Sequence, residues 1–121
     1  MTEEEQAVLK LNYAHESYNY CKNNKDANVK LHEDIIVNNK DVVYACDFAR
    51  YVVGANIERL QEVVINYGDS WHIYHFAYYI ANSNKEELFK AMLKLGNENW
   101  INEFIENIEL SQELKELTIF M

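Results

Sequence analysis

Proline is absent from this sequence of 121 residues, and glycine occurs only three times. Tight turns between strands depend on these residues, so their scarcity favours an all-α protein. Long hydrophobic runs are also missing, because no window approaches the roughly 18 uninterrupted apolar residues of a membrane-spanning helix. The start of the chain, Thr2-Glu-Glu-Glu-Gln, is acidic where a signal peptide is basic. We therefore expect one cytoplasmic domain over residues 1–121, without membrane contact.

Cysteine and basic residues are scarce as well. The two cysteines, Cys21 and Cys46, have neither metal-binding nor redox spacing, which predicts free thiols in a reducing compartment. Lysine and arginine total 11 against 20 acidic residues, and residues 97–121 hold six acids and one base. The net charge of −9 argues against direct binding of DNA or RNA, whose phosphates attract basic side chains. A basic protein is a suitable partner.

One sequence unit occurs twice in the middle of the chain. Asp41–Gly68 aligns with Asp69–Gly96 without a gap. The positions that match include Asp41 with Asp69, Phe48 with Phe76, Ala49 with Ala77, Tyr51 with Tyr79, Asn56 with Asn84, Leu60 with Leu88 and Gly68 with Gly96. A fixed period of about 28 residues indicates a helical-repeat architecture. Shifting the alignment by one period predicts diverged terminal units at 13–40 and 97–121.

Each unit has the local signals of two helices joined by a tight turn. Asp41, Asp69 and Asn97 stand where a first helix needs an N-cap, and asparagines at 28, 56 and 84 stand where a second helix needs one. Apolar residues then follow at helical spacing, as in Ile73, Phe76, Ala77 and Ile80. The N-terminal residues predict one long helix from Thr2 to about Asn24. These patterns predict an all-α stack of three or four helical hairpins, similar to an α-solenoid.

The segment Phe48 to Leu60 reads Phe-Ala-x-x-Val-x-Gly-Ala-Asn-Ile-x-x-Leu. It resembles short tandem helical repeats in uncharacterised proteins of bacteria and their phages, and the resemblance covers 41–96. It implies a small α-solenoid-like protein and transfers no catalytic motif. By analogy with small acidic phage proteins, it also implies an inhibitor of a host defence enzyme, of the anti-CRISPR kind.

The residues that differ between units indicate where a function could lie. Trp71, Tyr74 and Tyr78 fall on the side of helix 70–81 opposite its core positions, whereas the other units carry chemically different residues there. Tryptophan and tyrosine dominate the energetics of protein interfaces, so one interpretation is a partner-binding surface. The alternatives are packing between neighbouring repeats, or the seam of a homodimer.

Histidines and acids suggest two further hypotheses. His72 and His75 lie three residues apart on one helix face, a spacing that can present two imidazoles to a metal ion, although a histidine bonded to a neighbouring carboxylate is the plainer interpretation. We expect no metal, no cofactor and no enzymatic activity, since the usual catalytic motifs are missing. Glu103 and Glu106 belong to a C-terminal group of acids that is either a solvated surface or a mimic of nucleic acid.

Together these patterns predict a non-enzymatic protein-binding module. The residues expected to bind the partner are Trp71, Tyr74, His75, Tyr78, Glu103 and Glu106. The expected partner is a basic nucleic-acid-binding enzyme, occluded by an acidic inhibitor. A homodimerising scaffold and a metal-dependent activity at His72 and His75 are the alternative functions.

Overall fold

The computed structural model describes residues 1–120, with side-chain surroundings for residues 1–118, and it is helical throughout this part of the chain. Its helices are α1 (Glu3–Leu11), α2 (Ala14–Asn23), α3 (Val29–Asn38), α4 (Val42–Tyr51), α5 (Ile57–Tyr67), α6 (Ser70–Tyr79), α7 (Lys85–Leu95), α8 (Glu98–Asn107), α9 (Gln112–Glu116) and the 3₁₀ helix η1 (Leu117–Phe120). The last residue of the predicted fourth unit, Met121, lies outside the described residues.

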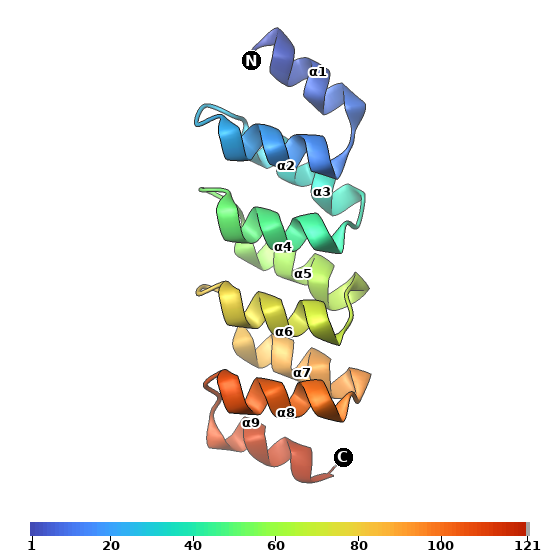
Figure 1. Ribbon diagram of the computed structural model, residues 1–121, viewed down its shortest axis with the longest axis vertical. Helices are drawn as coiled ribbons and strands as arrows, with labels where there is room; N and C mark the ends of the chain where they lie inside the picture. The colour runs from blue at the N-terminus through green and yellow to red at the C-terminus, as the bar shows by residue number, and fades with distance from the viewer. Residues whose placement is uncertain (121) are drawn as a thin grey trace.

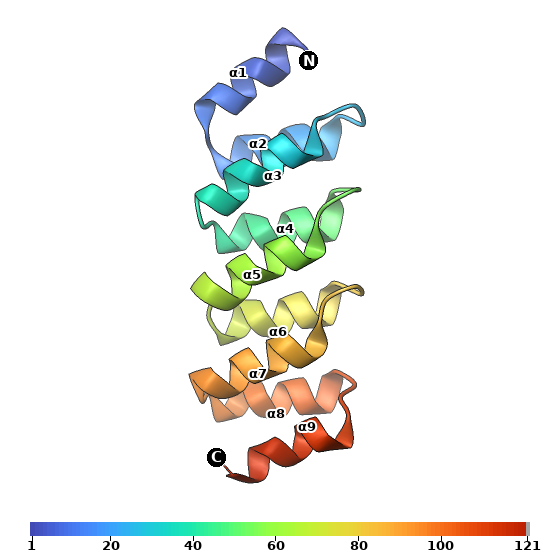
Figure 2. The same cartoon turned by 180° about the vertical axis from the view of Figure 1, so that it is seen from behind.

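The helices form an elongated two-layer stack, which confirms the predicted all-α repeat fold. Figure 1 shows α2, α4, α6 and α8 side by side in one layer. Figure 2 views the stack from behind and shows the second layer, which holds α3, α5, α7 and α9. The first helices of the units begin at 14, 42, 70 and 98, so the period of the sequence is also the period of the structure.

Polar caps set where the helices begin. The side chains of Asp41, Asp69 and Asn97 each accept a hydrogen bond from the backbone N–H three residues later, as predicted. Asparagines 28, 56 and 84 cap α3, α5 and α7 in the same way. Each such cap satisfies a backbone donor that the helix itself leaves without a partner.

The core lies between the two layers. Phe48, Phe76 and Phe104, which occupy one column of the repeat, are at most 1% exposed. Second helices supply Leu60, Val64, Leu88 and Phe89, which are fully buried. Because each unit packs on its neighbours along the stack, the first helices form one long face that is open to solvent.

The predicted long first helix is wrong, because the chain breaks between α1 and α2. Asn12 adopts a left-handed backbone (φ 57°) and its N–H bonds to the Leu9 carbonyl, and Tyr13 is extended. The break turns α1 back along the end of the stack, where the carbonyl of Asn12 accepts a bond from the Asn39 side chain. Asparagine adopts this conformation more readily than most residues, so no glycine is needed.

A buried polar ladder explains why α1 packs there. Glu5, Glu33 and Gln61 recur at the repeat period and are at most 3% exposed. Each accepts a hydrogen bond from the backbone N–H of the asparagine that caps the next second helix, so the ladder joins one unit to the next. Since Glu5 is in register with the others, α1 occupies the place of a second helix from a preceding unit.

The candidate aromatic surface of α6

Helix α6 exposes aromatic rings on the side that does not face the core. Ile73, Phe76 and Ala77 are buried, as their spacing predicts. Trp71 is 49% exposed and Tyr78 is 53% exposed, and Tyr79 beside them is also exposed. An aromatic surface of this kind on a helix is more typical of a contact site than of ordinary solvated surface.

Three of these side chains stack along the helix at intervals of four residues. The ring centroids of Trp71 and His75 are 4.0 Å apart with an interplanar angle of 29°, and those of His75 and Tyr79 are 5.8 Å apart at 20°. The Arg50 guanidinium of α4 continues the stack, 4.0 Å from the Tyr79 centroid. These contacts hold the rings in place before any partner arrives, which lowers the entropic cost of binding.

One hydrogen bond fixes the tautomer of His75. Its Nδ1 lies 2.8 Å from the carbonyl oxygen of Trp71, which can only accept a hydrogen bond. Nδ1 therefore carries the proton and donates, and in the neutral ring Nε2 is an acceptor. His75 is only partly buried.

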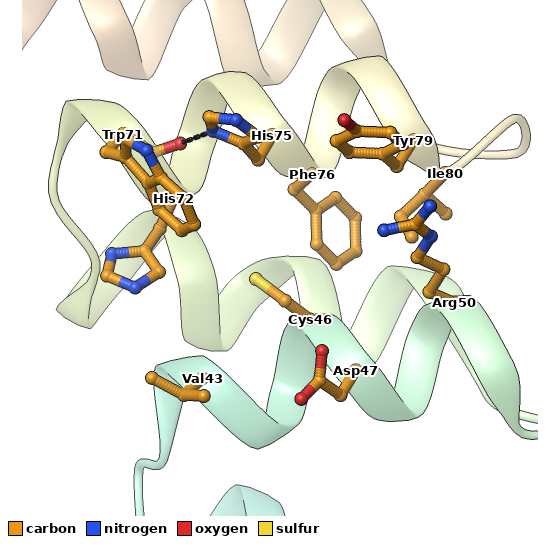
Figure 3. A pocket seen from close by; sticks show the side chains of 10 residues that line it. All are labelled: Val43, Cys46, Asp47, Arg50, Trp71, His72, His75, Phe76, Tyr79 and Ile80. Atoms are coloured by element: carbon orange, nitrogen blue, oxygen red, sulfur yellow. Dashed lines mark hydrogen bonds between the residues drawn. The ribbon is translucent and has the colours of Figure 1, made fainter.

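The aromatic stack forms one wall of a pocket between α4 and α6, of about 430 Å³, which we call the α4–α6 pocket. Helix α4 contributes Val43, Cys46, Asp47 and Arg50, and the segment from α6 to its C-cap contributes Trp71, His72, His75, Phe76, Tyr79 and Ile80. Figure 3 shows these side chains facing each other across the space between the helices. Burial raises the pKa of Asp47, and the positive charges of Arg50 and Lys22 oppose that rise.

Tyr74 differs from the other two aromatic residues predicted for the partner-binding row. It is only 8% exposed, and its ring packs 5.2 Å from Trp100 and 6.4 Å from Phe104 of α8. Tyr78 stacks over it at 5.8 Å. A partner would therefore contact Trp71 and Tyr78, whereas Tyr74 supports them from below and joins two repeats.

The remaining predicted residues lie around a second depression, the α6–α8 groove. His75, Glu103 and Glu106 line this groove of about 630 Å³ together with Tyr74 and Trp100. Glu103 accepts a hydrogen bond of 3.0 Å from the side chain of Asn107. His75 lines both depressions, so the α4–α6 pocket and the α6–α8 groove form one continuous surface across three first helices.

The acids of the C-terminal units are open to solvent. Glu98, Glu103, Glu106, Glu109, Glu113 and Glu116 are all exposed. Among the residues that the structure describes, no lysine, arginine or histidine side chain forms an ion pair with their carboxylates. This end of the stack consequently presents a negative surface beside the aromatic rings.

The two neighbouring histidines have separate partners. His72 Nδ1 lies 2.7 Å from Asp69 Oδ1, whereas His75 bonds to a backbone carbonyl. The backbone N–H of His72 and then its side chain hold the pKa of Asp69 below its ordinary value. In the described part of the chain, no three His, Cys, Asp or Glu side chains lie close enough together to hold a metal ion.

Sequence reasoning missed the α4 half of the pocket. Val43, Cys46 and Arg50 occupy the same columns as the aromatic row, but they appear unremarkable when helix 70–81 is considered alone. The available signal was the size of the residue in the column of Tyr18, Cys46 and Tyr74, where only the middle member is small.

No described helix is both long enough and apolar enough to cross a membrane. Comparison with protein-family models, with curated proteins and with solved structures finds no match for this chain.

Proposed function

We propose that this protein is a non-enzymatic binding module that contacts a protein partner through the exposed surface of α4, α6 and α8. The observation that carries the proposal is the preorganised stack of Trp71, His75 and Tyr79, which adjoins a pocket on each side. Partly exposed aromatic side chains supply large contact areas at low entropic cost, and they recur at the centres of protein interfaces.

The charge of the chain favours a basic partner, and we propose a nucleic-acid-binding enzyme. The net charge is −9, and the acids of α8 and α9 are exposed beside the aromatic surface. Such a surface speeds the encounter with a basic channel, while the rings provide apolar contact after docking. By occupying that channel the protein would act as an inhibitor, in the manner of a phage anti-defence or anti-CRISPR protein.

The test is co-precipitation of partners by the tagged protein from a lysate of the cells that encode it. Trp71→Ala combined with Tyr78→Ala removes two exposed rings and should abolish capture of any specific partner. The matched control is Tyr67→Ala combined with Leu95→Ala, which removes two side chains of similar exposure from the opposite layer. Circular dichroism should show that all variants are folded.

The outcomes separate the proposal from its alternatives. Both parts of the proposal would be supported if wild type and the control capture a basic nucleic-acid-binding enzyme that the Trp71→Ala, Tyr78→Ala variant does not capture. Salt should release this enzyme. Equal capture by all three proteins would contradict the binding surface. Capture of only a second copy of the chain, with a doubled mass in light scattering, would instead assign the surface to a homodimer.

A further inference from the structure

The α4–α6 pocket lies beside a position where one tyrosine of the repeat is replaced by cysteine. Tyr18, Cys46 and Tyr74 occupy the same position in three successive first helices. Tyr18 is 6% exposed and Tyr74 is 8% exposed, and each ring packs against an aromatic ring of the next first helix. The Cys46 side chain is far shorter, and an open pocket of about 430 Å³ lies where the third ring would be.

The two tyrosines share one aromatic neighbour position in the next first helix. Tyr18 packs 5.6 Å from the ring of Tyr44, and Tyr74 packs 5.2 Å from that of Trp100, which occupies the same repeat position as Tyr44. Tyr74 also meets the edge of Phe104. The residues that stand in these two positions relative to Cys46 are His72 and Phe76, which both line the pocket. The pocket thus keeps the aromatic walls that surround a buried tyrosine in its neighbours.

A carboxylate influences each of the two buried tyrosines. Burial raises the pKa of Tyr18 and Tyr74, and the next contributions come from the negative charges of Asp47 and Glu103, which share one repeat position. In the unit that follows Cys46 this position is held by His75, another residue of the pocket. His75 Nε2 is an acceptor, because Nδ1 donates to the Trp71 carbonyl. A phenol in this pocket would have His75 at the repeat position that holds a carboxylate in the units after Tyr18 and Tyr74.

We propose that the α4–α6 pocket is a socket for a tyrosine side chain of the partner protein. The ring enters between His72 and Phe76, and its hydroxyl donates a hydrogen bond to His75 Nε2. Trp71 and Tyr79 flank the entrance and cover the side chain that enters. This inference rests on the proposed function, since it names the residue by which the partner is anchored to the aromatic surface.

The charges around the pocket favour a phenol over a cationic side chain. Asp47 is the only carboxylate among the lining residues, and Arg50 beside it already provides a positive charge. The Arg50 guanidinium also covers the Tyr79 ring at 4.0 Å, which is the position that an incoming arginine would need for a cation–π contact. A second positive charge would be repelled by Arg50, whereas a neutral ring would not.

The socket can be tested directly with p-cresol, which is the side chain of tyrosine as a free molecule. Titration into the purified protein should shift the NMR signals of the His75 and Trp71 rings at millimolar concentrations. Toluene, which lacks the hydroxyl, should bind about fivefold more weakly because it makes no hydrogen bond to His75. Methylguanidinium binding more tightly than p-cresol would overturn the proposal in favour of an arginine site.

Cys46→Tyr should fill the socket with the chain's own tyrosine. We expect this variant to weaken p-cresol binding at least tenfold while the thermal midpoint of unfolding stays the same or rises, because Tyr18 and Tyr74 are accommodated at equivalent positions. Cys46→Ala, which leaves the pocket open, should bind p-cresol as wild type does. Cys46→Leu, a partial filling, provides a second test if the tyrosine variant folds poorly. If Cys46→Tyr and Cys46→Leu are folded and still bind p-cresol as tightly as wild type does, the socket is refuted.

Co-precipitation of the partner then distinguishes failure of the socket from failure of the proposed function. If Cys46→Tyr and the Trp71→Ala, Tyr78→Ala pair both lose the partner while Cys46→Ala retains it, the socket is supported. If Cys46→Tyr retains the partner and the aromatic pair loses it, the socket is wrong and the binding surface stands. If every variant retains the partner, both proposals are wrong.

Discussion

Replacing Glu33 with glutamine should stabilise this protein, and the gain should depend on pH. Glu33 is 3% exposed; its Oε2 accepts a bond of 3.1 Å from the Asn56 N–H, whereas its Oε1 is buried without a hydrogen-bond partner. The nearest cation, Arg59, is 3.9 Å from Oε1 and also pairs with Asp34. A buried acceptor without a partner costs roughly 1–3 kcal/mol, and more if it is charged.

The pKa of Glu33 gives the direction of the pH dependence. Burial raises it above the ordinary value of 4.5, although the Asn56 N–H and Arg59 oppose the rise. The unfolded chain therefore releases this proton before the folded chain does, and wild type loses stability as pH rises through the folded pKa. Glutamine has no charge to bury, and Gln61 shows that an amide can accept the same N–H bond, at 2.8 Å from Asn84.

We expect Glu33→Gln to raise the free energy of unfolding by about 1 kcal/mol at about pH 8, and by clearly less at about pH 4, where wild-type Glu33 is protonated. Urea denaturation followed by circular dichroism and by tryptophan fluorescence measures both values. Glu58→Gln is the matched control, because it removes the same charge from an exposed position. A gain of equal size at both pH values, or a loss of stability at the higher pH, would refute the reasoning.

Three further substitutions, with Val53→Ala as an exposed control, test other parts of the structure by the same denaturation assay. Phe76→Ala should lower the free energy of unfolding by about 3–5 kcal/mol, because the ring is 1% exposed; Val53→Ala, at a position 94% exposed, should change it by less than about 0.5 kcal/mol. His32→Leu removes the imidazole whose Nε2 lies 2.9 Å from the buried Glu5 carboxylate, and it should lower the free energy of unfolding by about 3–5 kcal/mol. A loss below about 1 kcal/mol would show that water replaces the imidazole. Asn84→Ala removes the N-cap of α7 and should cost about 1 kcal/mol.

The repeat fold could be predicted because its signals are local and occur several times. A capping asparagine or aspartate, followed by apolar residues at helical spacing, fixes the start and the buried side of each helix without knowledge of distant contacts. The break after Asn12 could not be predicted in this way, because neither proline nor glycine marks it. It depends on the contacts of α1 with the first unit, which are tertiary.

The candidate site was predicted in part, for a similar reason. Periodicity places Trp71 and Tyr78 away from the core, and they are exposed. It cannot place Tyr74, because the first helices bury two faces, one against the second layer and one against the next first helix. A helix that is apolar on every side does not reveal which residues face which neighbour. The pocket lies beside Cys46, which is smaller than Tyr18 and Tyr74 at the same repeat position, and this difference becomes visible only when the units are compared.

The buried ladder was missed because glutamate is usually exposed. Its signal was nevertheless present in the sequence, since Glu5, Glu33 and Gln61 recur at the repeat period and each stands at the same distance before a capping asparagine. A polar residue that recurs in register with a cap is a candidate for a contact between units. Apolar periodicity alone does not detect such a residue.

The ladder also determines the order in which the units can stack. Gln61 donates from its amide nitrogen to Glu87 at 3.0 Å, whereas Glu33 has Arg59 at the corresponding place. If 69–96 followed directly on 13–40, the Glu33 carboxylate would meet that of Glu87 in place of Arg59. That pairing is repulsive, so neighbouring units that share a backbone shape are not interchangeable. Exchanging 41–68 with 69–96 should therefore yield a chain whose helices form but whose interfaces do not match.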